Sequence, residues 1–337
     1  MLSRVANSLC WLARYLERAE NTARLVDVNL KLLPDLVDLE DEQINRHWLP
    51  IVESSGDEEE FARLHPEVTG RAVTEFMVFQ AENPNSIVST VGKARENARM
   101  VRDQITSELW EELNRIYLFL HSPRARELWN SSAFELLDRV KSASLLLQGL
   151  DAATVAHDEG WHFMQVGRFL ERADKTTRFL DLRWRSFTAD ERVKDVGQVA
   201  ALEWGAILRS CSAWDRYKTI HSNRVDPSLV AQLLIFGLEF PRSVRFCVEQ
   251  ADRSLRAISG SAVGRFSNDA ERLSGKLVAE LQFGTLDEVL ITGLHEYLDQ
   301  LQIQFNDIGD AMFQAYIFQP AHAAVEEQWQ QQQQQQQ

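Results

Sequence analysis

The sequence predicts an all-α protein, a helical bundle built from two copies of one helical unit. Three observations support this prediction. The chain of 337 residues has only 15 Gly and 8 Pro, so the residues that punctuate turns are sparse. Leu, Ala, Glu and Arg dominate where a β-protein would show β-branched runs. Finally, two blocks of sequence recur within the chain, which indicates an internal repeat.

The repeat is clearest between residues 12–27 and 166–181, which align at a shift of 154 with eight of sixteen positions identical. A second block, 73–86, aligns with 230–243 at a shift of 157. We therefore expect a duplicated unit of about 155 residues. The first copy would span 1–156 and the second 157–320. Each copy alone would leave an apolar face uncovered, so we expect the two to pack about a pseudo-twofold axis into one body.

The helices are expected in the same order in both copies. Those of the first copy cover 3–32, the region around Trp48, a segment ending at Glu82, and 107–156. Those of the second cover 160–187, the region around Trp204, a segment ending at Glu239, and 262–318. A Pro follows in the first turn of the next helix, where its fixed φ is suitable and its missing N–H costs nothing. The pairs Ser122-Pro123 and Asp226-Pro227 repeat this start signal.

Two segments fall outside the predicted helices. Residues 53–68 are acidic and rich in turn formers, which predicts a solvated loop. Residues 321–337 end in a run of Gln, a low-complexity composition that cannot bury enough surface to fold, so we expect a disordered tail.

Composition also limits the classes of partner. A formal net charge of −14 argues against nucleic acid and anionic membranes, because binding phosphates needs a basic surface. Cys10, Cys211 and Cys247 form an odd, scattered set without metal-ligand spacing, which fits a reducing cytosol. Residues 1–20 have arginines within the apolar pattern, so we expect a helix there and not a signal peptide. No apolar run reaches membrane-spanning length. These features predict a cytoplasmic location.

The first helix of each copy has one apolar and one charged arc. The charged positions are Arg14, Glu17, Arg18, Asn21 and Arg24 in the first copy, and Arg168, Glu171, Arg172 and Arg178 in the second. One interpretation is a solvated face with short-range ion pairs. The other is that both arcs face inward as a fixed Arg/Glu network, which could hold the halves in register or receive an acidic ligand. The repeated identities bring the second interpretation level with the first, because solvated positions accept most polar residues.

A second charged cluster, Arg95, Glu96, Arg99 and Arg102, has no full counterpart in the other copy. A single functional site on a symmetric scaffold would show this asymmetry, and so would neutral drift. The predicted binding groove therefore comprises Arg14, Glu17, Arg18, Arg24, Arg95, Glu96, Arg99, Arg102, Arg168, Glu171, Arg172 and Arg178. Glu159 and His162 have a ligand spacing used in di-metal bundles, but the second motif such sites need is absent. Nucleotide-binding and hydrolase motifs are also absent. We therefore expect no catalytic residue, metal or cofactor.

The motifs resemble those of the bacterial alpha-E domain family. Residues 1–9 followed by 11–24 are similar to the start of that family, although Cys10 stands where an aromatic residue is expected. Later similar motifs are Asn83-Pro84-x-Ser86-Ile87, residues 94–103, Trp110-Glu111-x-Leu113-Asn114 and Phe240-Pro241-Arg242-Ser243-Val244. The resemblance extends to about residue 320 and implies an all-helical protein. It also implies partnership with a circularly permuted ATP-grasp amide ligase, often with a transglutaminase-like cysteine protease.

Together these observations predict a non-catalytic accessory or binding subunit. It would act with the ligase and offer an Arg/Glu-lined groove to an acidic peptide, amino acid or phosphate group. Two alternatives remain open. One is an autonomous enzyme of amide-bond chemistry with Glu17, Glu171 or Glu96 as general base, which requires a carboxyl group with a raised pKa. The other is a structural dimerisation module in which the charged network only sets the register.

Overall fold

The computed structural model describes residues 1–36, 48–189, 197–221 and 224–318. Every regular element within these ranges is helical, which confirms the all-α prediction. The predicted Gln-rich tail at 321–337 lies outside the described residues. No described helix is long and apolar enough to cross a membrane.

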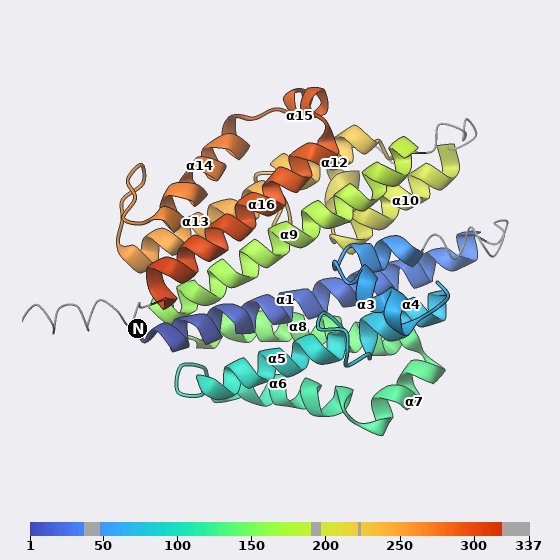
Figure 1. The fold of residues 1–337 in the computed structure, drawn as a ribbon, viewed down its shortest axis with the longest axis horizontal. Helices are drawn as coiled ribbons and strands as arrows, with labels where there is room; N and C mark the ends of the chain where they lie inside the picture. Colours follow the sequence, from blue (N-terminus) through green and yellow to red (C-terminus); the bar gives the residue numbers. More distant parts are fainter. Residues whose placement is uncertain (37–47, 190–196, 222–223, 319–337) are drawn as a thin grey trace, which may run out of the picture.

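Two long helices form the centre of the molecule. Helix α1 (Ser3–Leu32) and helix α9 (Glu159–Ala189) lie side by side, as Figure 1 shows, and match the predicted long helices. The helices approach closely near Cys10. A Cβ on Gly167 of α9 would lie 2.3 Å from the carbonyl oxygen of Cys10, a distance that real Cβ atoms do not show. Glycine therefore permits the close packing of the two helices at this crossing.

The rest of the first half packs on the α1 side of this pair. After a short 3-10 helix (Leu33–Leu36) and a helical stretch at 48–53 come α3 (Glu58–Leu64), α4 (Gly70–Val78), α5 (Ile87–Met100), α6 (Ser107–Leu120), α7 (Pro123–Ser131) and α8 (Ala133–Thr154). Helices α5 and α8 contact α1 directly, whereas α6 packs on α5 and α8. In Figure 1, α5, α6 and α7 lie below the central pair.

The second half packs on the α9 side. It contains α10 (Gly197–Ser210), α11 (Trp214–Ile220), α12 (Pro227–Phe236), α13 (Val244–Ser259), α14 (Asp269–Phe283), α15 (Leu286–Thr292), α16 (Leu294–Met312) and a final π-helical turn (Phe313–Ile317). Helices α13 and α16 contact α9, and α14 packs on both of them. In Figure 1, α14, α15 and α16 lie above the central pair.

A hydrophobic cluster that runs from Ala6 to Met312 includes buried residues of both halves. Its largest fully buried side chains include Trp48 and Trp204, the residues around which the second helix of each copy was predicted. The Pro start signals at Pro123 and Pro227 are also found at helix starts, and the Asp226 carboxylate accepts hydrogen bonds from two backbone N–H groups of α12.

The predicted solvated loop at 53–68 is wrong, because the segment contains helix α3. Phe61 in this helix is only 2% exposed and packs edge-on against Phe76 of α4 at a ring distance of 5.1 Å. The acidic residues Glu58, Glu59 and Glu60 occupy the first turn, where they complement the positive end of the helix dipole. Composition suggested a loop, but one buried aromatic ring and a favourable charge at the N-terminus are enough for a short helix.

The two central helix starts also differ from the prediction. The preceding helices end at Val78 and Phe236, several residues before Glu82 and Glu239, and Pro84 and Pro241 lie outside the helices that follow. Instead, serine side chains form the caps. Ser86 Oγ accepts the backbone N–H of Ser89 at 3.1 Å, and Ser243 Oγ accepts that of Phe246 at 3.2 Å. A side-chain cap satisfies an otherwise unpaired helix N–H, which Pro cannot do.

Candidate functional site

Glu17 of α1 lies in the interior, opposite α9, and is 1% exposed. Arg172 of α9 binds it with both arms of its guanidinium group, from Nε to Oε1 at 2.9 Å and from Nη2 to Oε2 at 2.7 Å. Arg242, from the turn before α13, adds a third hydrogen bond to Oε1 at 3.1 Å. The bidentate fork is the strongest geometry available to an Arg–carboxylate pair.

Glu171 of α9 occupies the matching position and is also 1% exposed. Arg18 of α1 donates from Nε to Oε1 at 2.6 Å and from Nη2 to Oε2 at 2.9 Å. Arg14 adds a bond to Oε2 at 3.2 Å. The pairing is therefore reciprocal, because the Glu-Arg dipeptide of each helix supplies a carboxylate to one pair and a guanidinium to the other.

These contacts set the protonation of the two carboxyl groups. Burial by itself would raise the pKa of Glu17, but the guanidinium groups of Arg172 and Arg242 outweigh it and lower the pKa to about 2. Burial likewise opposes ionisation of Glu171, and Arg18 and Arg14 lower the pKa of this carboxyl well below its ordinary range. Both groups are therefore carboxylates at neutral pH, and neither is suited to accept a proton from a substrate.

A neighbouring layer of the network was missed by sequence reasoning. Arg242 donates to Asn21 at 2.7 Å and to Glu20 at 2.5 Å. Glu20, which is 0% exposed, also accepts Gln148 of α8 at 2.7 Å and Ser144 at 2.9 Å. The signal was present in the sequence, because Arg242 lies within the second repeated block. It was overlooked because its counterpart there, Asn85, is uncharged.

Asn85 nevertheless has an equivalent role in the first half. Its Oδ1 accepts Arg18 Nη1 at 2.7 Å, and its Nδ2 donates to the carboxylate of Asp57 at 3.0 Å. The turns before α5 and α13 thus both contact the central ion pairs, one through an amide and the other through a guanidinium group.

The other predicted residues of the two long helices lie around these pairs. Arg24 and Arg178 form pairs within their own helices, with Glu20 at 2.8 Å and with Asp174 at 2.8 Å. Arg168 donates from Nη2 to Asp151 of α8 at 2.7 Å. The eight predicted charged residues of α1 and α9 thus all form ion pairs along the two central helices, and those of Glu17 and Glu171 cross from one helix to the other.

The remaining four predicted residues lie elsewhere, on α5 beside α6. Arg95 donates to Asn114 at 2.8 Å, and its guanidinium lies 4.5 Å from the ring centre of Tyr117. Glu96 pairs with both Arg95 and Arg99, while Arg102 stacks over a tryptophan of α6. Arg99 is 61% exposed. These side chains form a solvated stripe on the outer surface and do not join the central network in one groove.

A group of potential metal ligands that the sequence did not suggest lies between α9 and α16. His295 Nδ1 lies 2.7 Å from Asp181 Oδ1, and Nε2 lies 3.6 Å from Asp299 Oδ2. Each of the three side chains offers one ligand atom, and these atoms lie within 4.8 Å of one another, close enough to bind one ion. The geometry fits an imidazole held between two carboxylates. Of the predicted spacing pair, Glu159 instead binds the N-terminal ammonium group at 2.9 Å.

Comparison with known proteins accounts for the paired dipeptides. A family model named Alpha-E, described as a predicted alpha-helical domain with a conserved ER motif, matches residues 1–317. The chain belongs to the Alpha-E family. In this Alpha-E chain, Glu-Arg occurs at 17–18, 171–172, 191–192 and 271–272, and the first two of these dipeptides form the reciprocal buried ion pairs described above.

Curated relatives of this Alpha-E chain include an uncharacterized protein of Mycobacterium bovis and uncharacterized proteins of two strains of Mycobacterium tuberculosis. Each is 23% identical over 331 residues, which cover 92% of this chain but only 36% of the relative. The chain thus spans about a third of the length of these proteins. No solved structure matches the chain.

Proposed function

We propose that this chain is a non-catalytic accessory subunit that acts with an ATP-grasp amide ligase in the cytoplasm. In this proposal it binds an acidic peptide, amino acid or phosphate group through arginine side chains. The observation that carries the non-catalytic part is the closed bidentate pairing of Glu17 and Glu171. An autonomous enzyme would use Glu17, Glu171 or Glu96 as general base. The pKa values of Glu17 and Glu171 are lowered and both carboxylates are buried. Glu96 is half exposed and forms ion pairs with Arg95 and Arg99.

The central network supports a structural role for the ER dipeptides. The paired charges join α1 to α9 across 155 and 153 residues of sequence, respectively. Such pairs specify one register of two helices, because a displaced helix would leave a charge buried without its partner. Their reciprocity, together with the repeated sequence blocks, supports our proposal that the halves arose by duplication and are related by a pseudo-twofold axis.

The arginine stripe on α5 supports the binding role. Arg95 and Arg102 lie over aromatic rings of α6, with guanidinium-to-ring distances of 4.5 Å for Arg95 and 4.8 Å for Arg102. Stacking restricts the guanidinium plane and reduces the entropy lost when it binds a carboxylate or phosphate. The overall charge of −14 makes such a basic surface distinctive on this chain.

Partnership with the ligase follows from the sequence resemblance, and the greater length of the mycobacterial relatives is consistent with an Alpha-E region that works beside other polypeptide. The test is to purify the chain with the circularly permuted ATP-grasp ligase encoded in the same genome. We expect the two to co-elute in size-exclusion chromatography. ADP release and amide product should both rise when the chain is added to the ligase.

The binding surface is tested with the double variant Arg95→Ala/Arg99→Ala. We expect less product without loss of co-elution. A matched control, Arg71→Ala/Arg124→Ala, removes two exposed charges on α4 and α7 and should leave the rate unchanged. An unchanged ligase rate when the chain is omitted would refute the accessory role.

A further inference from the structure

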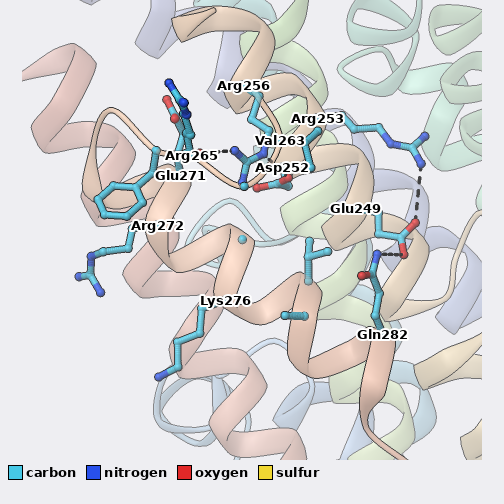
Figure 2. Close-up of a pocket in the computed structure, with 15 residues that line it drawn as sticks. Glu249, Asp252, Arg253, Arg256, Val263, Arg265, Glu271, Arg272, Lys276 and Gln282 are labelled. Carbon is cyan, nitrogen blue, oxygen red and sulfur yellow. Dashed lines mark hydrogen bonds and ion pairs between the residues drawn. The ribbon is translucent and has the colours of Figure 1, made fainter. Parts of the chain in front are cut away.

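A groove of about 500 Å³ lies between α13 and α14, beneath the loop that connects them. Figure 2 shows the charged residues around it, with Arg253 and Glu249 at one edge and Arg272 and Lys276 along the other. Small and apolar residues, including Gly275, form part of its lining. This volume lies in the range of small-molecule sites.

The three carboxylates of the groove are already satisfied by protein donors. Asp252 accepts Arg256 at 2.7 Å and a serine of α14 at 2.7 Å. Glu271 accepts backbone and side-chain donors from the preceding loop and has a pKa of about 2, because these hydrogen bonds outweigh the effect of burial. Glu249 accepts Arg245 at 3.1 Å and Gln282 at 3.1 Å. Their charge is therefore largely compensated within the protein.

Two cations of the groove are left without such partners. Among the described residues, neither the guanidinium of Arg265 nor the ammonium of Lys276 has a hydrogen bond or ion pair, although both line the groove. Arg253 is only loosely paired, 3.8 Å from Glu249, and is 68% exposed. The five cations and three carboxylates of the lining thus give a positive local field on an acidic protein.

The loop above the groove holds apolar side chains in water. Val263 is 91% exposed and Phe266 is 60% exposed. The loop is nevertheless fixed, because Arg256 donates to the backbone carbonyl groups of Ala262 and Arg265. A rigid loop that exposes apolar groups beside unpaired cations provides both parts of a site for an amphipathic anion.

In the corresponding helix pair of the first half, aromatic side chains occupy this position. Four and eleven residues after its capping residue, α6 has Trp110 and Tyr117, on which Arg95 lies. At the same two positions α14 has Arg272 and Ala279. In α14 a solvated Arg and the methyl group of Ala279 stand where α6 has two large aromatic rings, so the space between α13 and α14 stays open.

We propose that the groove between α13 and α14 binds a small organic anion, a carboxylate or phosphate ester attached to an apolar group. Figure 2 shows Arg265 and Lys276 at opposite ends of the groove, so the anion would lie against one of these two cations and the apolar group against Val263, Phe266 or the face of α14. This site is separate from the arginine stripe on α5, so the inference goes beyond the proposed function. Its test uses this chain alone, so that its failure is distinct from failure of the ligase partnership.

The test is isothermal titration of the full chain at low salt, where charge interactions are least screened. The probes are phenyl phosphate, 3-phenylpropionate, inorganic phosphate and neutral 3-phenylpropanamide. We expect at least one of the two aromatic anions to bind about tenfold more tightly than both inorganic phosphate and the amide. Which of the two binds better distinguishes a phosphate site from a carboxylate site.

Two variants and one control locate the binding. Arg265→Glu/Lys276→Glu should weaken the better anion about tenfold, since two attractive charges become repulsive. Ala279→Tyr should abolish binding by restoring the aromatic residue found in the first half. Arg71→Glu/Arg124→Glu makes the same change in net charge elsewhere and should alter the affinity less than about twofold. Equal affinity for the anions and the amide, or unchanged binding in the first variant, would overturn the proposal.

Discussion

Replacing Glu17 with Gln should destabilise the protein far more than any exposed charge would. Glutamine is nearly the same size, so the packing of α1 on α9 is retained. The change removes one negative charge and leaves Arg172 without its bidentate partner in an interior where its side chain is 8% exposed. Arg242 loses one of its two charged partners but keeps Glu20.

The expected loss of stability can be calculated from the pKa of the Glu17 carboxyl group. Its ordinary value is 4.5 and its value in the folded protein is about 2. At about 1.4 kcal/mol for each pKa unit, the folded environment favours the Glu17 carboxylate by about 3 kcal/mol. Breaking a buried ion pair by removing one partner typically costs about 3–5 kcal/mol. We therefore expect the free energy of unfolding to fall by about 3–4 kcal/mol at pH 7.

The assay is urea unfolding followed by far-UV circular dichroism, in which the midpoint should fall by about 1–3 M. Glu75→Gln, which breaks a partly exposed ion pair with Arg126, is the control and should change stability by less than about 1 kcal/mol. The double variant Glu17→Gln/Arg172→Gln should lose less than the sum of the two single variants. A loss below about 1 kcal/mol for Glu17→Gln would refute the conclusion that this pair holds the two halves together.

Three further outcomes follow from the structure. Gly167→Ala should destabilise the protein by about 1–3 kcal/mol, because the added methyl group would clash with the backbone of Cys10. Gly149→Ala is the control, since Gly149 has open space around it, and should be neutral or stabilising by up to about 1 kcal/mol. Equal urea midpoints for the two variants would contradict this prediction. Burial raises the pKa of Cys10 to about 11 and the pKa values of the other two thiols to about 12. Ellman's reagent should therefore label none of the three at pH 8 until urea is added. Rapid labelling of the folded protein would count against their burial. Because the pKa of Glu17 is lowered, its stabilising contribution is present above pH 4.5 and is lost as the pH falls towards 2. The urea midpoint should therefore decrease between pH 4.5 and 2, and it should decrease less in Glu17→Gln. The same dependence of the midpoint on pH in both proteins would exclude Glu17 as the cause.

Sequence periodicity predicted the main helices well because their apolar stripes repeat over many turns. The predicted 3–32 and 160–187 differ from the observed helices by two residues at most. Short elements were less predictable. Helix α3 depends on one aromatic side chain, Phe61, which packs into a core formed by distant segments. The acidic sequence around Phe61 does not indicate that contact. Helix caps were misplaced because a Pro and a Ser two residues apart both signal a helix start, and only the structure shows which acts.

The charged residues of the long helices were identified from their repetition, since a solvated face would not retain Arg and Glu at the same positions. Repetition could not show which carboxylate pairs with which guanidinium group. It also could not show that Arg95 and its neighbours face outward, because one-dimensional spacing places residues on a helix but not the helix in the molecule. Arg242 was missed for a related reason: a single charged residue in a turn has no periodicity, and its partners on α1 lie 225 and 222 residues away.

These separations have a consequence for synthesis on the ribosome. Glu17 is translated 225 residues before Arg242, which completes its set of ionic partners. At about 5–20 residues per second, the carboxylate is without this partner for roughly 10–45 s. For most of that interval the bidentate partner Arg172 on α9 is also missing, since it follows Glu17 by 155 residues, and the turn before α13 is made only at the end. The amino-terminal half should therefore stay open until most of the chain has emerged, and closing the molecule becomes a late and cooperative event.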